Sequence, residues 1–294
     1  MKVDGGVGFD LDTVGAQAQE LEEMGYAGLM SAETAHDPFF PLLLAAQQTS
    51  KVELMTSIAV AFARSPMTLA NIGHDLNAYS KGRFVLGLGS QIRAHITKRF
   101  SMPWSSPAAR MREFILAMRA IWENWHEGKA LEFAGKFYTH TLMTPFFTPT
   151  GNEFGAPKVF LAAVGPKMTE VAGEVADGMI VHAFTTEKYL RETTLPSLEK
   201  GFAKAGKNRA DFEISYPVFV CTGQTEEELE EAKRATAQQI AFYGSTPAYK
   251  PVLDSIGVGD MQSELNAMSK QGRWVEMGQL ISPDIMTQFA IVGE

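Results

Sequence analysis

The strongest constraint on the fold is an alternation of two sequence patterns along the chain. Short apolar stretches typical of buried strands occur at 2–7, 26–31, 52–62, 83–89, 159–164, 178–183 and 212–222. Stretches with apolar residues at helical spacing occur at 11–24, 39–49, 67–79, 111–125, 168–176, 187–205 and 225–243, and Thr225 and Glu228 form a capping box for the last. Strand and helix in turn, repeated about seven times, predict parallel strands joined by right-handed crossover helices.

Two architectures fit this pattern: an open doubly wound sheet and a closed barrel. A doubly wound dinucleotide-binding sheet typically carries G-x-G-x-x-G after its first strand, and no such motif follows residues 2–7. The length of 294 residues and the number of strand–helix units both favour the barrel. We therefore predict an α/β chain folded as a (β/α)8 TIM barrel.

Two stretches interrupt the alternation. Residues 129–157 are rich in aromatic residues, Thr, Gly and Pro, and residues 244–282 contain the basic and aromatic piece KQGRWVEM. We interpret both as excursions from one barrel, so that residues 1–294 form a single domain. After the stretch 289–292 the chain offers no eighth strand and helix. Either 262–292 supplies a closing strand, or the C-terminal unit of the barrel is incomplete.

Charge and composition exclude several kinds of partner. The formal net charge is -8 and the pI is near 5.4, whereas nucleic acid and acidic membranes attract basic surfaces, so we expect neither as a partner. The chain has no apolar run long enough to span a membrane and no signal-peptide core in MKVDGGVGFD, which predicts a cytoplasmic protein. The one cysteine, Cys221, lies in an apolar setting and is expected to pack rather than react.

The stretch YAGLMSAETAHDPFF, residues 26–40, places two acids and a histidine directly after a predicted strand. In a barrel of parallel strands, functional side chains lie at the C-terminal ends of the strands. Glu33 and His36 are therefore candidates to orient a substrate or move a proton. The alternative is structural: Asp37 caps the helix that begins at Phe39, and His36 packs in the turn. The residue types leave both readings of Glu33 and His36 open.

Small residues follow the third and fourth strands. Thr56, Ser57 and the small residues beyond them would let a flat group lie against the strand end, although an ordinary buried strand explains them equally. The piece GLGS, residues 87–90, contains two glycines that would let a ligand approach the backbone closely. The segment QIRAHITKRF then brings four basic side chains, which either hold an anionic group or form a solvated face.

A candidate phosphate site follows the fifth strand. Gly165 and Pro166 open a helix whose free N–H groups, next to Lys167, are suited to an anion, although an ordinary turn has the same sequence. His182 closes the next strand and would face the same end of the barrel, where a lone histidine also has a structural explanation.

Motifs of other chemistries are missing from the sequence. The six histidines are scattered without metal-ligand spacing, so no metal site is predicted. There is also no nucleophile elbow and no Walker-type loop. The predicted strand ends therefore suit an organic cofactor with an anionic end, in a site with few ionisable protein groups.

Four segments together resemble one family: GYAGLMSAETAHDPF, MTSIAVAFARSPMTLA, KGRFVLGLGS and PKVFLAAVGPKMTEVAGEVADGMIVHAF. Over nearly its whole length the chain resembles the bacterial-luciferase-like superfamily, and within it the coenzyme F-420-dependent (deazaflavin) oxidoreductases. The resemblance implies a TIM barrel of the bacterial-luciferase type with insertions, assembled as a homodimer. It also implies a flavin or deazaflavin bound at the C-terminal end of the barrel.

The resemblance assigns parts of this cofactor to individual residues. In the family, a bulge in the third strand with a non-prolyl cis peptide supports the ring, and the matching bond is Ser57–Ile58, followed by Ala59. Gly87, Gly89 and Ser90 match the segment along the ring and ribityl side. The residues that match the backbone of the phosphate-binding segment are Ala163, Val164, Gly165 and Pro166. The lysines of the family pattern have no obvious match, and Lys167 is a nearby candidate, as is His182 for a contact with the cofactor.

The chain departs from the deazaflavin pattern at three places. Many members carry an acid followed directly by histidine after the second strand. Here Thr34 follows Glu33 and His36 comes two residues later, so either His36 takes over the proton step or Glu33 acts alone. His182 stands where the pattern has a threonine near the phosphate. Relatives also continue past position 294 with a closing strand and helix.

The function that the resemblance implies is hydride transfer between coenzyme F-420 and a small organic substrate. Glu33 and His36 would orient this substrate or manage its proton. Two alternatives stay open at this point. One is an FMN-dependent monooxygenase that receives reduced flavin from a partner reductase, and the other is a non-catalytic flavin-binding barrel.

Overall fold

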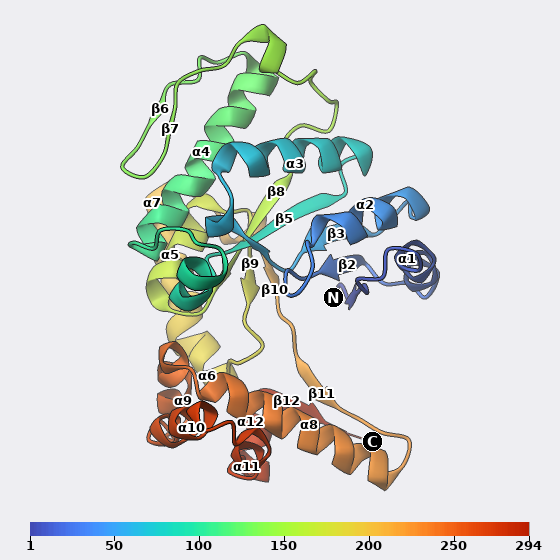
Figure 1. Ribbon diagram of the computed structural model, residues 1–294, viewed down its shortest axis with the longest axis vertical. Coiled ribbons are helices and arrows are strands. Elements are labelled where there is room, and N and C mark those ends of the chain that lie inside the picture. The colour runs from blue at the N-terminus through green and yellow to red at the C-terminus, as the bar shows by residue number, and fades with distance from the viewer. Residues whose placement is uncertain (294) are drawn as a thin grey trace. The chain divides into compact units, whose positions relative to one another are not determined.

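The computed structural model describes residues 1–293, which form two compact units. The sheet unit comprises residues 1–162, 171–180 and 201–213. The helical unit comprises residues 163–170, 181–200 and the chain from 214 onward. Figure 1 shows the elements of both units, coloured along the chain.

A sheet whose strands follow the order of the chain organises the sheet unit. This order is β1 (Asp4–Gly6), β2 (Gly28–Ser31), β3 (Glu53–Thr56), β5 (Phe84–Gly89), β8 (Lys158–Ala163), β9 (Gly178–Val181) and β10 (Glu213–Ser215), with β4 (Ala59–Val60) paired to β5. The pairs from β1 to β8 are parallel. The predicted α/β class with crossover-joined parallel strands is therefore confirmed.

The two ends of this sheet approach each other. Lys2, just before β1, donates from Nζ to Glu53 Oε2 at 2.9 Å and to Glu213 Oε2 at 3.3 Å. Glu213 begins β10, the last strand in the order, and it also pairs with Lys158 at the start of β8. Because one lysine just before the first strand reaches residues of the third and last strands, the sheet is curled as in a barrel.

We expect this ion-pair network to contribute little to stability, because its side chains are exposed. The hydrogen bond from Lys158 is the main cause that holds the pKa of Glu213 below its ordinary value. A lowered carboxyl pKa stabilises the fold above the unfolded-state pKa, and this contribution is lost as the pH falls through the folded-state pKa. Glu213→Gln should therefore lower the free energy of unfolding by at most about 1 kcal/mol at pH 7, and by less in 1 M salt. Urea unfolding beside Glu153→Gln, an exposed control, would measure this, and a loss above about 2 kcal/mol would contradict it.

Helices follow the strands as the alternation predicts. They are α1 (Val14–Glu23), α2 (Phe39–Gln48), α3 (Pro66–Tyr79), α4 (Pro107–Glu127) and α5 (Pro166–Val175). Helix α2 packs on β2 and β3, and α3 packs on β5 and α4 (Figure 1). Between the strands, Met55, Val85, Phe160 and Ile180 form a buried apolar cluster from β3, β5, β8 and β9. Alternate strand residues thus fill the inner face of the curled sheet.

Three predicted elements are interrupted in the structure. The stretch 52–62 is not one strand: β3 ends at Thr56, a cis peptide joins Ser57 to Ile58, β4 follows, and a 3-10 turn η1 (Ala61–Ala63) ends it. The stretch 212–222 divides into β10 and β11 (Phe219–Cys221). The stretch 187–205 divides into α6 (Glu187–Tyr189), the π-helical turn η4 (Leu190–Thr194) and α7 (Leu195–Ala205). An apolar run shows where backbone is buried, but not where its hydrogen-bond pattern changes.

The first excursion is a hairpin held against helix α4. Strands β6 (Phe133–Ala134) and β7 (Thr139–His140) pair antiparallel, and the 3-10 turn η3 (Pro145–Phe147) follows. The carboxylate of Glu113 accepts three backbone N–H bonds from residues 136–138 at 2.6–2.9 Å. The buried Arg110 donates from Nε to the Tyr138 hydroxyl at 2.7 Å. Two side chains of one helix therefore fix the hairpin.

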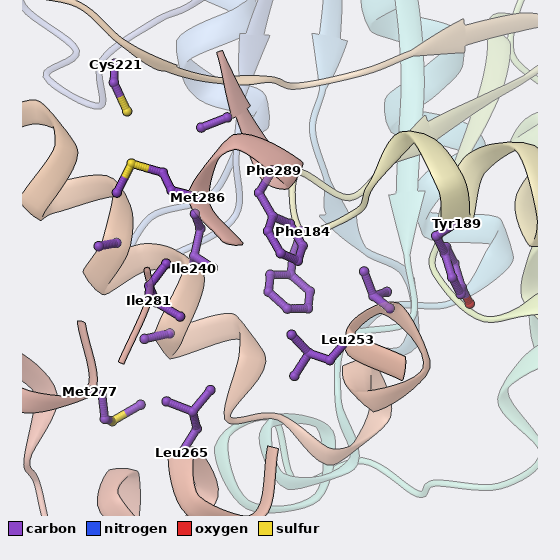
Figure 2. Packing of buried hydrophobic residues seen from close by; sticks show 14 of the residues in the cluster. Phe184, Tyr189, Cys221, Ile240, Leu253, Leu265, Met277, Ile281, Met286 and Phe289 are labelled. Carbon is purple, nitrogen blue, oxygen red and sulfur yellow. The ribbon is translucent and has the colours of Figure 1, made fainter. Parts of the chain in front are cut away.

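The second excursion lies wholly within the helical unit. It contains the 3-10 turn η6 (Pro247–Tyr249), α9 (Lys250–Ser255), α10 (Met261–Lys270) and α11 (Trp274–Gly278), packed near α8 (Glu226–Gly244) and α12 (Pro283–Phe289). The capping box predicted at the start of α8 is confirmed. Figure 2 shows the core of this unit, where the rings of Phe184 and Phe289 stack with centroids 4.7 Å apart. Cys221 lies in the same core, as predicted.

A strand is present near the C-terminal end, at β12 (Ala290–Val292). It pairs parallel with β11, opposite Phe219–Cys221. The sequence left two alternatives, a closing strand within 262–292 or an incomplete C-terminal unit. The range does contain a strand. In the described chain this strand belongs to a separate two-stranded sheet rather than to the path from β1 to β10.

Candidate functional site

The loops that follow several strands meet at the C-terminal end of the sheet unit. The loop after β2 carries Glu33, His36 and Asp37. His36 packs against Phe9, from the loop after β1, with ring centroids 5.4 Å apart. Arg64, from the segment after β4 and η1, pairs with both acids of the β2 loop. The sheet order thus brings these loops together, as expected for a barrel of parallel strands.

Glu33 is fixed by two strong hydrogen bonds. Its Oε2 accepts from Arg64 Nη1 at 2.6 Å and from the backbone N–H of Val60 at 2.7 Å. Its own N–H donates to the Ile58 carbonyl at 3.1 Å. The Glu33 side chain is 6% exposed and the Arg64 side chain 15% exposed, so this ion pair is largely desolvated. The carboxylate ties the loop after β2 to β4, the strand that contains the predicted cofactor residue Ala59.

Asp37 bonds the first N–H of helix α2, as the capping explanation predicts, although Pro38 occupies the N-cap position itself. Its Oδ1 accepts from the backbone N–H of Phe39 at 2.9 Å, and its Oδ2 accepts from Arg64 Nη2 at 2.8 Å. The structural reading of Asp37 is therefore confirmed. His36, between the two acids, is exposed; its ring packs on Phe9, and among the described residues its side chain forms no hydrogen bond or ion pair.

The predicted ring-binding residues Ser57, Ile58 and Ala59 lie beside this loop. The non-prolyl cis peptide expected at Ser57–Ile58 is confirmed. The N–H of Ser57 donates to the Ser31 carbonyl at 2.7 Å. Ser31 itself is buried, and its Oγ has no hydrogen-bond partner within residues 1–293. An unpaired buried hydroxyl at a strand end is a group that a ligand would satisfy.

The glycines of β5 are explained by strand packing. A Cβ added at Gly87 would lie 1.9 Å from the Thr56 carbonyl oxygen, and one added at Gly89 would lie 2.8 Å from Ile58 Cδ1. Thr56 Oγ1 also donates to the Gly87 carbonyl at 2.7 Å. The half-buried Ser90 follows, with its Oγ donating to the Gln91 carbonyl at 3.2 Å. Contact of Gly87, Gly89 and Ser90 with a cofactor stays a prediction.

The predicted phosphate-binding segment 163–167 lies at the start of α5. The Gly165 carbonyl accepts from the N–H groups of Met168 and Thr169, both at 3.1 Å, which starts the helix. The Tyr189 hydroxyl donates to the Val164 carbonyl at 3.2 Å. Lys167 is exposed, and no atom lies within 4 Å of a Cβ added at Gly165. The Tyr189 hydroxyl thus anchors this segment at Val164, and the space beside Gly165 is free of protein atoms.

His182 lies in the helical unit among aromatic rings. Its ring packs edge-on against the Tyr243 ring, with centroids 4.6 Å apart. It packs at a tilt against the Tyr249 ring, with centroids 4.8 Å apart. Its Nδ1 accepts from the backbone N–H of Phe184 at 3.0 Å. Burial lowers the pKa of His182 to about 4, and burial raises the pKa of Tyr249 to about 12. At neutral pH the imidazole is therefore uncharged, with its proton on Nε2.

The basic side chains after β5 are mostly solvated. Arg93, His95 and Lys98 are exposed, and the π-helical turn η2 (His95–Arg99) carries the last two. Arg99 differs, because it donates from Nη2 to the Thr34 carbonyl and lies over the Phe100 ring at 4.8 Å. A fourth loop therefore reaches the segment that carries His36.

Arg64 is the residue that sequence reasoning missed. It stands in FARSP, directly after an apolar run, and its two partners lie about thirty positions earlier in the chain. A cation placed directly after a buried strand was the available signal, since such a group requires an anionic partner when it is buried.

Two features are absent from the described part of the chain. No helix within residues 1–293 is both long enough and apolar enough to cross a membrane. The same residues contain no group of three or more His, Cys, Asp or Glu side chains placed to hold a metal ion.

Comparisons with known proteins place this geometry in a family. Residues 2–294 match the family model described as luciferase-like monooxygenase. An uncharacterized protein of Mycobacterium tuberculosis is 53% identical over 293 residues, covering 100% of this chain and 86% of the relative. A 5,10-methylenetetrahydromethanopterin reductase of Archaeoglobus fulgidus is 26% identical over 256 residues, covering 86% and 73%.

A solved structure is similar over the same length. The coenzyme F-420 dependent tetrahydromethanopterin reductase from Methanopyrus kandleri matches with a TM-score of 0.80 at 20% identity, covering 100% of this chain and 86% of that one. This likeness confirms the predicted fold of the bacterial-luciferase type. With the family model matching nearly every residue, the chain belongs to the luciferase-like monooxygenase family.

Proposed function

We propose that this chain is an oxidoreductase that binds coenzyme F-420 and exchanges a hydride with a small organic substrate. The observation that carries the proposal is the fold match over the whole chain to a reductase named for coenzyme F-420. It agrees with the lack of a nucleophile elbow in the sequence and of a metal cluster among the described residues, because hydride chemistry that belongs to a cofactor needs neither. A homodimer is the assembly we expect.

The residues present fit a deazaflavin in each unit separately. In the sheet unit, the unpaired Ser31 Oγ and the backbone of residues 57–59 offer polar atoms at the strand ends. In the helical unit, the segment 163–167 would receive the phosphate at a helix N-terminus, and His182 would offer an uncharged N–H. The bound cofactor would supply hydride chemistry.

The protein's own contribution to the reaction would be position and proton handling. His36 is the exposed imidazole of the β2 loop and is suited to hold or give a proton at a substrate atom. Glu33 would act through the loop, because both its Oε2 bonds run to other protein groups. His36→Ala should therefore lower kcat by about 10²-fold or more while leaving cofactor affinity nearly unchanged.

A binding titration tests the cofactor assignment. We expect oxidised coenzyme F-420 to bind with micromolar or tighter Kd, and FMN at least tenfold more weakly. Lys167→Ala should weaken F-420 several-fold but leave the deazaflavin riboside, which lacks the phosphate, unaffected. Lys51→Ala, an exposed lysine before β3, is the matched control. A preference for FMN would instead identify a flavin monooxygenase, and binding of neither cofactor would overturn the proposal.

A further inference from the structure

We propose that Arg64 is a positioning residue that clamps the β2 loop and thereby places His36, with Glu33 and Asp37 serving as its counter-ions. The inference concerns the site of the proposed function and rests on it only where turnover is the measurement. It assigns Glu33 a different task from that of a proton-transfer group.

The clamp is built from one guanidinium and two carboxylates on opposite ends of the loop. Arg64 Nη1 donates to Glu33 Oε2 at 2.6 Å, and Nη2 donates to Asp37 Oδ2 at 2.8 Å. Nη1 also lies 3.3 Å from the Val60 carbonyl, and the guanidinium lies 5.4 Å from the centre of the Phe39 ring. Glu33 begins the loop and Asp37 ends it, so the span that carries His36 is held at both ends.

Burial strengthens the hydrogen bonds of this clamp. The side chains of Arg64 and Glu33 are 15% and 6% exposed, so water competes weakly for their hydrogen bonds. Asp37 is more exposed, at 35%, but its other oxygen is engaged by the Phe39 N–H. Loss of one partner would leave the other charge buried without compensation, which the fold tolerates poorly.

Elimination then leaves His36 as the free titratable group of the loop. The loop contains three titratable side chains, Glu33, His36 and Asp37. The two carboxylates both accept bonds from Arg64 and from backbone N–H groups. His36 contacts only the Phe9 ring among the described residues and is exposed. A substrate at this strand end would therefore meet an imidazole whose position the arginine sets.

A lysine cannot reproduce this arrangement. The two carboxylates are reached by different nitrogens of one planar group, whereas an ammonium is a single point charge on a flexible chain. The test is therefore a series at one position: Arg64→Lys keeps the charge and loses the fork, and Arg64→Gln loses both. Arg234→Gln removes a positive charge from an exposed site in the helical unit and is the control.

Hydrogen exchange followed by mass spectrometry measures the clamp without substrate or cofactor. Exchange of the Glu33, Phe39 and Val60 amides should rise at least tenfold in Arg64→Gln, rise less in Arg64→Lys, and stay unchanged in Arg234→Gln. Asp37→Ala, which removes both acceptor oxygens, should accelerate exchange of the Phe39 amide but leave the Val60 amide protected, because the bond from Val60 to Glu33 persists. This milder variant keeps the test valid if Arg64→Gln fails to fold. Wild-type exchange at Val60 and Glu33 in a folded Arg64→Lys or Arg64→Gln would overturn the inference.

Turnover provides the second readout once a substrate is known. Arg64→Lys should lower kcat at least tenfold with little change in the cofactor Kd. If hydrogen exchange responds as expected but the protein binds neither cofactor, the clamp stands and the proposed function falls. An Arg64→Lys variant with loosened amides and full turnover would instead show that the clamp has no positioning role.

Discussion

Replacing Gly87 by alanine is expected to destabilise the sheet unit by about 3 kcal/mol or more. The new Cβ would lie 1.9 Å from the Thr56 carbonyl oxygen and 2.8 Å from Ile180 Cδ1. The isoleucine can turn aside, but the carbonyl belongs to β3, which is paired with β2 on one side and with β5 on the other. The backbone of β3 or β5 must therefore move, and the Thr56 hydroxyl bond to the Gly87 carbonyl would be lost with it.

Matched glycine variants separate this packing effect from the general cost of losing a glycine. Gly89→Ala meets only the side chain of Ile58 and should cost about 1–2 kcal/mol. Gly165→Ala meets no atom within 4 Å and should stay within about 0.5 kcal/mol of wild type. Urea unfolding followed by tryptophan fluorescence suits the comparison, because Trp104, Trp122 and Trp125 all lie in the sheet unit. A Gly87→Ala protein within 1 kcal/mol of wild type would contradict the argument.

This variant also bears on how the GLGS motif should be read. The sequence offered two explanations for a pair of glycines at a strand end, a ligand or a close neighbour, and both need the same missing side chain. The structure supplies the neighbour: β3 on one side of Gly87 and Ile58 beside Gly89. Which explanation applies depended on the pairing of strands that are about thirty residues apart in the chain, and a local motif does not contain that information.

Elements with a local cause were predictable from the sequence. Helix α8 is an example, because its capping box and apolar spacing lie within the helix itself. The order of strands β1 to β10 was predictable as well, since parallel strands joined by helices leave few topologies. The break after Thr56 was predictable only through the family resemblance, because the apolar run through residues 58–62 continues across it.

Interactions between distant segments account for what sequence reasoning missed at the site. Glu33 and His36 were correctly expected in the loop after β2, but the partner of Glu33 was not, because Arg64 follows a different strand. The pairing of β12 with β11 could not be predicted for the same reason, because several helices separate the two strands in the chain. Residue types at strand ends therefore indicate which groups gather there, whereas the contacts between loops decide which of them are free to act.

The second large effect is expected at His182, as a loss of stability in mild acid. The folded chain holds the pKa of His182 at about 4 through burial, against an ordinary value of 6.5. The unfolded chain therefore binds a proton more readily. The stability that this histidine contributes is present above pH 6.5 and is lost as the pH falls from 6.5 toward 4. The full contribution is about 3 kcal/mol, of which about 2 kcal/mol should be lost between pH 7.5 and pH 5.

Two variants isolate this contribution from that of the other histidines. His182→Phe keeps an aromatic ring between Tyr243 and Tyr249, and His182→Asn keeps an acceptor for the Phe184 N–H, but neither side chain titrates. Both should therefore show a smaller fall in unfolding free energy between pH 7.5 and pH 5 than wild type, by about 2 kcal/mol. The exposed His95, replaced by Asn, is the control. Urea unfolding followed by far-UV circular dichroism measures the free energy of unfolding at each pH. An equal fall in the wild type, both His182 variants and the His95 control would contradict the prediction.

The same result constrains how His182 would serve a cofactor. An imidazole that resists protonation down to about pH 4 brings no positive charge to a phosphate at neutral pH. With Nδ1 engaged by Phe184, it offers one N–H donor on Nε2. We therefore expect His182→Phe, which has no N–H donor, to weaken binding of coenzyme F-420 by the several-fold typical of one neutral hydrogen bond, independent of pH between 6 and 8. Affinity that instead rises steeply as the pH falls through this range would show that the bound cofactor protonates His182.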